Sequence, residues 1–438
     1  MAKFGAPAAV CALGLACLLA LTGCAEENGQ EATTPFLSTE TAIVPSPSPS
    51  ATAAAEAGPL GAYVVSVADG SRTRLTVGEG YSVVTWSQDG TGLTLAQGEI
   101  AGDQDVYQVN ADGSELTLTA TVDGWVGPWS PASRAVIRYE AGQDEGTGRV
   151  EYGLYVTSPG ARLGRWVADG FMGTWSPDAQ RIAFVGNFCD EAQDYVAVVN
   201  VDGSGLVRLT DIVDALQVGH AWSPDSRTLA ISAPDEAGVP QIYLADVESG
   251  GRVKLTDGPW PKMRPAWSAD GAFLSFAALE GEGPGATSTH WVMPKEGGDA
   301  TRLPAGIGYL AWSPQGRRLA FVIGGELQLL DIEEGGEPMT LAQLGEGEGF
   351  DFHWSPDGSR IAFLKQSSGS DVAFLGQGRL SVVGADGSGE KQLTDETLLQ
   401  PGEGSGSPLV IDSIRWSPGG TKIAFAVVLP SVARGVCS

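Results

Sequence analysis

One ten-residue pattern recurs along the chain and restricts its fold more than any other feature. It consists of Trp-Ser, a turn of the Pro-Asp-Gly kind and an apolar strand, as in WSPDGSRIAF from Trp354. Seven further copies, two of them weaker, begin at Trp86, Trp129, Trp175, Trp222, Trp267, Trp312 and Trp416. The eight Trp residues are 43, 46, 47, 45, 45, 42 and 62 residues apart. Repetition with this period indicates a β-propeller or a solenoid.

Each repeat contains the elements of four short antiparallel strands. Ser-Pro-Asp-Gly suits a type I turn, because proline presets φ and the serine oxygen can bond nearby backbone. A second half follows, with an Asp-Gly hairpin turn as at residues 202–203 and a strand that ends in Leu-Thr as at residues 209–210. Four such strands make one propeller blade. We interpret the eight Trp side chains as packing residues between blades.

The two ends of the repeat region complement each other. Residues 61–76 form the second half of a unit without a first half, and residues 412–429 form a first half without a second half. Seven continuous units and this composite unit predict an all-β, eight-bladed propeller, closed by N-terminal and C-terminal strands that share one blade. Closure costs about 5 kcal/mol of chain entropy and removes two exposed sheet edges. We therefore expect residues 63–67 to lie beside residues 422–425.

The repeat also resembles a known family. The combination of Trp-Ser-Pro-Asp-Gly, Ile-Ala-Phe, Asp-Gly-Ser and Leu-Thr between Gly61 and Leu429 resembles the WD-repeat-like propeller repeat of the TolB family. The same repeat occurs in propellers attached to prolyl-oligopeptidase-like hydrolases and in many exported proteins. The resemblance implies the propeller fold and a habit of binding partners, and little more.

The N-terminus has the parts of an export signal. A positive charge at Lys3 precedes an apolar run from Ala8 to Leu21, which is shorter than the roughly 20 residues that span a membrane. The following Leu-Thr-Gly-Cys resembles the lipobox of bacterial lipoproteins, in which the cysteine carries the lipid. By this resemblance residues 1–23 are a signal peptide and Cys24 is the lipidation site. We expect an extracytoplasmic, membrane-anchored lipoprotein at the cell surface or in the periplasm.

Composition then divides the rest of the chain. Residues 24–59 are rich in Pro, Ser and Thr and predict an extended linker. The propeller should occupy residues 60–430, and residues 431–438 form a C-terminal tail. Cys189 and Cys437 remain for an oxidising compartment, where either a disulfide or two separate thiols is consistent with the sequence.

Motifs for catalysis and metal binding are not found in the sequence. A hydrolase of the prolyl-oligopeptidase type needs a Gly-x-Ser-x-Gly nucleophile elbow, and the chain has none. His220, His290 and His353 lie in different units without a second ligand at zinc-binding spacing. The Asp-Gly turns do not match a calcium-loop ladder, although acidic loops leave calcium open. We expect no catalytic residue, metal or cofactor, and therefore no enzyme.

Charge and loop position suggest a binding face. The formal net charge of -27 argues against nucleic acid as a partner and favours basic ligands. The loops before each Trp-containing strand should meet on one face of the ring, where an acidic rim surrounds aromatic residues. The candidates are Trp125, Phe171, Trp260, Met263, Arg264, Tyr309, Phe350, Asp351 and Asp412. Each of them could instead pack between blades.

The sequence therefore predicts a lipid-anchored propeller that binds a protein or peptide partner at the cell envelope without catalysis, and a basic partner is one option. The alternative is a carbohydrate-active enzyme or a glycan-binding propeller that acts in the central channel. Asp351 and Asp412 would be its paired carboxylates, and a separation of roughly 5 to 9 Å would favour that alternative.

Overall fold

The computed structural model describes residues 59–429 with several internal gaps. The segments outside the description are residues 99–103, 123–124, 131–134, 144–149, 158–163, 187–193, 212–218, 282–284, 346–350, 366–377 and 400–408. Cys24, Cys189, Phe350 and Cys437 lie outside the described residues. No helix in the described part is long and apolar enough to cross a membrane.

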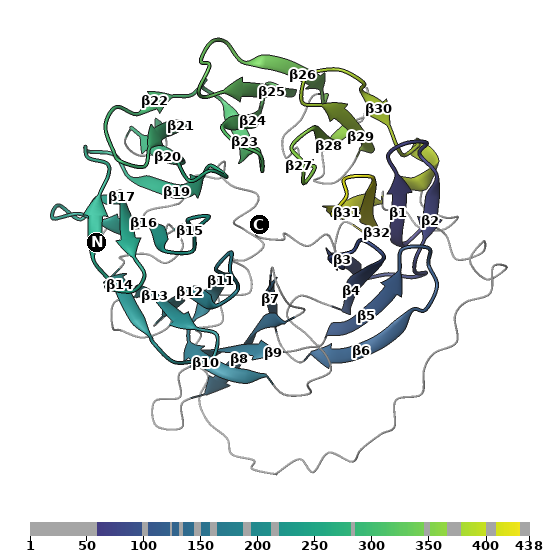
Figure 1. Cartoon of the computed structure of the whole chain (residues 1–438), viewed down its shortest axis with the longest axis horizontal. Coiled ribbons are helices and arrows are strands. Elements are labelled where there is room, and N and C mark those ends of the chain that lie inside the picture. Colours follow the sequence, from purple (N-terminus) through teal and green to yellow (C-terminus); the bar gives the residue numbers. More distant parts are fainter. Residues whose placement is uncertain are drawn as a thin grey trace.

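Eight four-stranded antiparallel sheets stand in a ring around a central axis (Figure 1). The predicted eight-bladed propeller is therefore confirmed. We number the blades by their innermost strands, from blade 1 (β3 to β6) to blade 7 (β27 to β30), and blade 8 contains β31, β32, β1 and β2.

The strands occupy equivalent places in successive blades. Innermost are β3 (Tyr81–Trp86), β7 (Trp125–Trp129), β11 (Phe171–Trp175), β15 (His220–Trp222), β19 (Lys262–Trp267), β23 (Ile307–Trp312), β27 (Phe352–Trp354) and β31 (Val410–Trp416). Second are β4 (Gly92–Gly98), β8 (Val136–Gln143), β12 (Arg181–Gly186), β16 (Thr228–Pro234), β20 (Phe273–Glu280), β24 (Arg318–Ile323), β28 (Arg360–Lys365) and β32 (Lys422–Val428). Third are β5 (Gln104–Asn110), β9 (Val150–Thr157), β13 (Tyr195–Asn200), β17 (Pro240–Asp246), β21 (Thr287–Pro294), β25 (Glu326–Asp331), β29 (Arg379–Gly384) and β1 (Gly61–Ser66). Outermost are β6 (Thr117–Val122), β10 (Arg165–Asp169), β14 (Val207–Asp211), β18 (Arg252–Lys254), β22 (Thr301–Arg302), β26 (Met339–Gln343), β30 (Lys391–Gln392) and β2 (Arg72–Arg74), and a short 3-10 helix, η3, covers Glu396–Leu399.

The two ends of the described chain share blade 8, as expected. Strand β1 pairs antiparallel with β32 over its whole length, with Tyr63 opposite Phe425 and Ser66 opposite Lys422. The rings of Tyr63 and Phe425 stack with their centroids 5.6 Å apart. This pairing closes the ring and leaves neither strand as an open edge.

The Trp-Ser-Pro-Asp-Gly turn forms through its serine and aspartate. In blade 7 the Ser355 hydroxyl donates to Asp357 Oδ1 at 2.6 Å and accepts the Arg360 N–H at 3.0 Å. The same serine contacts recur in blade 1, where hydrogen bonds from Ser87 and Thr91 lower the pKa of Asp89 to about 2. A carboxylate held in its ionised form by such donors fixes the turn that joins the first two strands.

The Trp side chains do more than fill space between blades. Six indole N–H groups donate to a backbone carbonyl of the preceding blade, always that of the residue just before its own Trp. The pairs are Trp86 with Arg415, Trp175 with Pro128, Trp222 with Thr174, Trp267 with Ala221, Trp354 with Ala311 and Trp416 with His353, at 2.9 to 3.3 Å. In blade 6 the indole of Trp312 donates instead to the Ser275 hydroxyl at 3.0 Å. One side chain thus both packs and bonds at each of these blade junctions.

Removing one indole N–H tests this junction. We expect Trp416→Phe to lower the free energy of unfolding by about 1–3 kcal/mol, because the His353 carbonyl loses its donor at a packed interface. Urea denaturation monitored by circular dichroism would measure the change. Trp291→Phe is a suitable control, since that indole donates to Thr289 within its own strand. A loss no larger than that of the control would contradict the role of the junction bond.

Candidate functional site

The residue just before the repeated Trp distinguishes two adjacent blades from the others. In six repeats it is small or uncharged, namely Thr85, Pro128, Thr174, Ala221, Ala266 and Ala311. In blades 7 and 8 it is His353 and Arg415. These side chains therefore add an imidazole and a guanidinium to the inner strands of two neighbouring blades, β27 and β31, which contact each other.

Arg415 is the centre of a group of polar residues on three successive inner strands. Its guanidinium interacts electrostatically with Asp412 on its own strand, with Asp351 just before β27 and with Tyr309 on β23. We name Tyr309, Asp351, His353, Asp412 and Arg415 the channel cluster. The three strands lie next to one another around the central axis (Figure 1).

Burial and the neighbouring carboxylates act on Arg415 in opposite directions. Burial lowers the pKa of its guanidinium, and Asp412 and Asp351 oppose that change by favouring the charged form. Because arginine starts from a very high pKa, it keeps its charge at neutral pH. One guanidinium N–H donates to the Ile414 carbonyl at 2.9 Å. The site therefore presents a half-buried positive charge between two negative ones.

A bulge in β31 brings Asp412 and Arg415 to the same side. Residues three apart in a regular strand point to opposite faces. The register of β31 against β32 shifts between Asp412 and Arg415, and Ser413 within this bulge has a left-handed φ of 58°. One extra residue reverses the alternation. The Ser413 hydroxyl also donates to the Asp412 carboxylate.

The other members of the channel cluster are held by their own neighbours. His353 Nε2 donates to Asp351 Oδ2 at 2.9 Å. The ring of Tyr309 meets the edge of buried Phe352 in the next blade, with centroids 5.0 Å apart and planes at 76°. These contacts orient the carboxylate and the phenol, since each is tied to a side chain with little freedom.

Of the remaining candidates, those in the described part of the chain belong to blades 2, 3 and 5 or directly precede them. Phe171 is buried in the hydrophobic core, which favours a packing role. Trp125 is the first residue of β7 and lies opposite Tyr139. Phe350 lies outside the described residues.

Trp260, Met263 and Arg264 form a separate group in blade 5. Trp260 and Met263 are half-buried, whereas Arg264 is exposed with a left-handed φ of 53°. The Trp260 carbonyl accepts a hydrogen bond from the Lys262 ammonium at 2.7 Å. Of the sequence-predicted residues, the channel cluster thus contains Tyr309, Asp351 and Asp412.

The histidines and carboxylates of the described part offer no metal site. No group of three or more His, Cys, Asp or Glu side chains is placed to hold an ion in those residues. Burial lowers the pKa of His220 to about 4, so its ring is neutral at physiological pH. Its Nε2 is 2.9 Å from the Thr174 hydroxyl of blade 3. His220 therefore links two blades.

Comparison with known proteins yields similarity over parts of the chain. No family model matches it. It is 28% identical over 208 residues to a Bacillus subtilis protein named "Uncharacterized peptidase YuxL", covering 45% of this chain and 29% of the relative. The matched region thus spans less than a third of that relative.

Solved structures resemble the chain in fold. TolB from Acinetobacter baumannii is 15% identical, with 76% of this chain and 78% of that one covered and a TM-score of 0.36. An oligogalacturonate lyase in complex with manganese is 13% identical, with 74% and 95% covered and a TM-score of 0.47. The resemblance to TolB-type propellers is therefore confirmed for the fold, and at these identities the likeness extends no further.

These comparisons correct one expectation. The sequence analysis predicted a protein without enzymatic activity, on the ground that no nucleophile elbow is present. A relative named as a peptidase contradicts that prediction. The absence of recognisable catalytic and metal-binding motifs was too narrow a criterion.

Arg415 and His353 were missed by the sequence analysis. Both lie directly before the repeated Trp. The sequence analysis considered only the Trp at this point of the repeat and did not compare the residues that precede it. Alignment of the eight repeats would have exposed both, because every other repeat has Thr, Pro or Ala at that position.

The channel cluster makes a testable energetic prediction. We expect Asp412→Asn to lower the free energy of unfolding by about 1–3 kcal/mol, because a half-buried guanidinium then loses a charged partner. The double variant Asp412→Asn with Arg415→Met should recover most of that loss, since it removes the uncompensated charge as well. Urea denaturation of the three proteins would measure both changes. A double variant less stable than Asp412→Asn alone would contradict the proposed coupling.

Proposed function

We propose that this protein is an exported, lipid-anchored propeller that binds a protein or peptide partner at the cell envelope through the channel cluster. The observation that carries the proposal is the half-buried guanidinium of Arg415, on which carboxylates from two adjacent blades act electrostatically. A rigid ring that presents both charge signs at one end of its inner strands can bind a peptide by complementary charges.

The chemistry of the cluster defines the kind of partner. Asp351 and Asp412 suit a lysine or arginine side chain, and Arg415 suits a carboxylate such as a peptide C-terminus. The net charge of -27 would accelerate the approach of a basic partner. Half-buried Tyr309 adds an aromatic surface beside the charges. The preferred ligand is therefore a basic or zwitterionic peptide segment.

The proposed location follows from the N-terminal sequence. Lipid on Cys24 would hold the chain at a membrane surface. A linker of residues 24–59 would let the propeller reach about 30 Å from that surface, by the scaling of flexible chains. Such a tether allows the ring to meet a partner embedded in, or attached to, the same membrane.

Cross-linking in the native bacterium, followed by mass spectrometry of the affinity-purified protein, tests the proposal. We expect partner proteins recovered with wild type to fall about ten-fold with the Asp412→Asn, Arg415→Met variant, because two charge-assisted contacts are lost. Arg181→Gln is the matched control, since Arg181 lies in blade 3 and pairs with exposed Glu248.

Two results would contradict the proposal. Equal recovery of every partner with the channel variant would exclude the channel cluster as the binding surface. Recovery of wild type and Cys24→Ser in the same soluble fraction would exclude the lipid anchor, independently of any partner.

A second function is favoured by one specific observation. Asp351 and Asp412 come from neighbouring blades and both act on Arg415, and paired carboxylates are the usual acid and base of glycoside hydrolysis. If the cluster is catalytic, purified wild type should release reducing ends from an oligosaccharide mixture. Asp351→Asn and Asp412→Asn should each abolish the release, and Arg181→Gln should not. Retention of activity in either Asn variant would exclude this use of the pair.

A further inference from the structure

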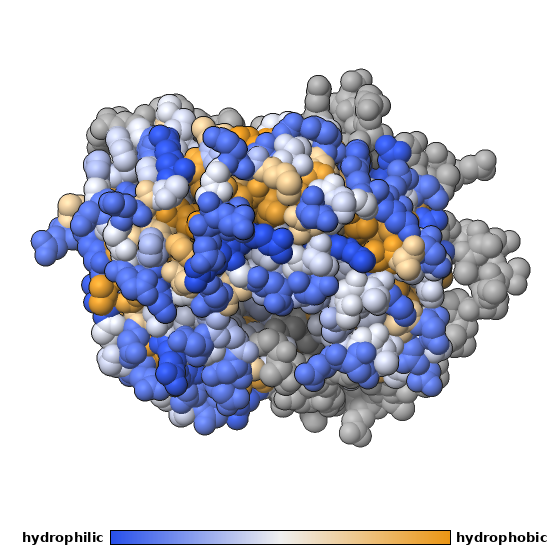
Figure 2. Space-filling model, turned by 45° about the horizontal axis from the view of Figure 1, so that its top comes forward, coloured by the Kyte–Doolittle hydropathy of each residue, from blue (hydrophilic) through white to orange (hydrophobic). Residues whose placement is uncertain are grey.

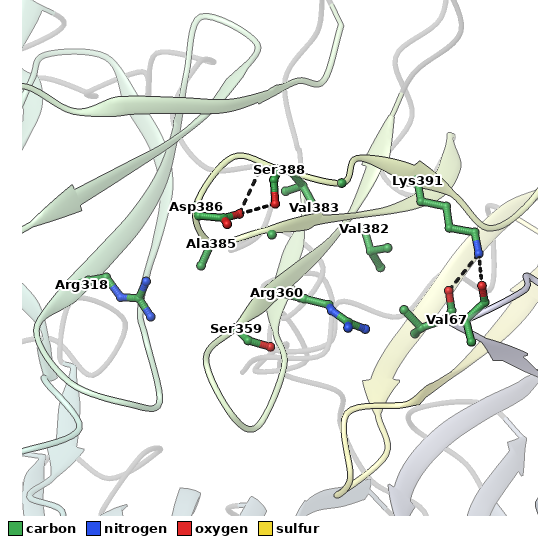
Figure 3. A pocket seen from close by; sticks show the side chains of 13 residues that line it. Val67, Arg318, Ser359, Arg360, Val382, Val383, Ala385, Asp386, Ser388 and Lys391 are labelled. Atoms are coloured by element: carbon green, nitrogen blue, oxygen red, sulfur yellow. Dashed lines mark hydrogen bonds between the residues drawn. The ribbon is translucent and has the colours of Figure 1, made fainter.

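A pocket of about 620 Å³ opens on the other face of the ring. It lies at the turns that join first to second strands and third to fourth strands in blades 6 to 8. Asp351 precedes β27 and Arg360 begins β28 after the intervening turn, so these two residues are at opposite ends of β27. Its lining includes Arg318, Arg360, Asp386 and Lys391 (Figure 3).

The pocket is basic in a strongly acidic protein. Three cations line it, from Arg318, Arg360 and Lys391, and the carboxylate of Asp386 is the negative group among its lining residues. The chain as a whole carries a net charge of -27, and hydrophilic side chains cover much of the face in Figure 2. A local excess of positive charge on such a background attracts anions.

Two of the three cations come from one repeated position. Arg318 and Arg360 each begin the second strand of their blade, six residues after the repeated Trp. In blade 3 the same position holds Arg181, whose guanidinium pairs with Glu248 at 3.3 Å. Arg360 has neither an ion pair nor a side-chain hydrogen bond to any residue in the described part of the chain. The N–H groups of its guanidinium are thus available to a ligand.

The other two cations are fixed in place. Arg318 donates to the Gly358 carbonyl at 3.0 Å and lies over the ring of Trp354, 5.8 Å from its centroid. The Lys391 ammonium donates to the Val67 carbonyl at 3.1 Å and to that of Ala68. Figure 3 shows Arg318 and Arg360 on strands of different blades, with the turn that contains Asp386 and Ser388 beside them. The frame of the pocket is therefore preorganised.

A glycine lets the turn beside the pocket pack closely against its own strand. Gly384 lies directly opposite Arg360 in the sheet. A Cβ at this position would come within 2.5 Å of Asp386 Oδ1 and 2.9 Å of the Ser388 carbonyl oxygen. Asp386 Oδ1 meanwhile accepts the Ser388 N–H at 2.9 Å and the Ser388 hydroxyl at 2.7 Å. That oxygen is hydrogen-bonded within its own turn, and Asp386 makes no ion pair with Arg360 in the described part of the chain.

We propose that this pocket binds the phosphate group of a small soluble molecule, with Arg360 as the principal contact and Lys391 on the same side of the pocket (Figure 3). Guanidinium groups match the oxygen geometry of phosphate with paired hydrogen bonds. A phosphate monoester carries about -1.5 to -2 charges at pH 7, which fits three cations and one carboxylate. An anionic membrane surface is too large to enter the pocket and would be repelled by the net negative charge of the whole chain. A small phosphate compound can enter the pocket and meet mainly the local positive charge, so we favour it as the ligand.

Titration of the purified chain with inorganic phosphate and with glycerol 3-phosphate, followed by calorimetry, tests this site. We expect both to bind wild type, and we expect Arg360→Gln to weaken binding by about ten-fold or more because a charge-assisted contact is lost. Arg360 is exposed and unpaired among the described residues, so the variant should unfold at the same temperature as wild type. Arg181→Gln, at the equivalent position of blade 3, should bind phosphate as wild type does.

Three outcomes would overturn the proposal. The first is the absence of heat with either compound at millimolar concentration, and the second is equal weakening by Arg181→Gln, which would indicate a general charge effect. The third is Arg360-dependent sedimentation with phosphatidylglycerol vesicles but no binding of glycerol 3-phosphate, which would make a lipid headgroup the ligand. None of these measurements involves the channel cluster.

Discussion

The hydrogen bond from a Trp indole to the preceding blade is the interaction on which the ring depends. A propeller blade is a small sheet that cannot bury its own faces, so its stability comes from its neighbours. The indole packs at that junction, and its N–H donates to a carbonyl on the inner strand of the preceding blade. The bond from Trp86 to Arg415 joins blade 1 to blade 8, so the same contact that spaces the blades also closes the circle.

The same hydrogen bond determines which positions of the inner strands can carry functional side chains. The bonded carbonyl belongs to the residue just before each Trp. The bond fixes the backbone of that residue, whereas the type of its side chain can differ from blade to blade. In blades 7 and 8 this freedom is used by His353 and Arg415. Charged groups on a backbone fixed in this way lose little additional entropy when they bind a ligand.

The sequence predicted the architecture because the repeat records it several times. The spacing of the Trp residues indicated the repeat length, and the turn residues indicated where strands begin and end. The incomplete units at the two ends of the repeat region predicted a shared blade, and the pairing of β1 with β32 confirms it. The candidate site was only partly predictable. Tyr309, Asp351 and Asp412 were found as polar or aromatic residues before the Trp, but a β-bulge at Ser413 decides which of them share a side. Bulges depend on the paired strand and have no reliable pattern in a single chain.

The pairing of β1 with β32 has a mechanical consequence. The chain enters the ring through β1, the third strand of blade 8, which is flanked by β32 on one side and β2 on the other. A pull on the residues before Gly61 acts along this strand, parallel to its neighbours. All of its ladder bonds then share the load, whereas a pull across the sheet would open them one after another. The ring is thus built to resist tension from its N-terminal side.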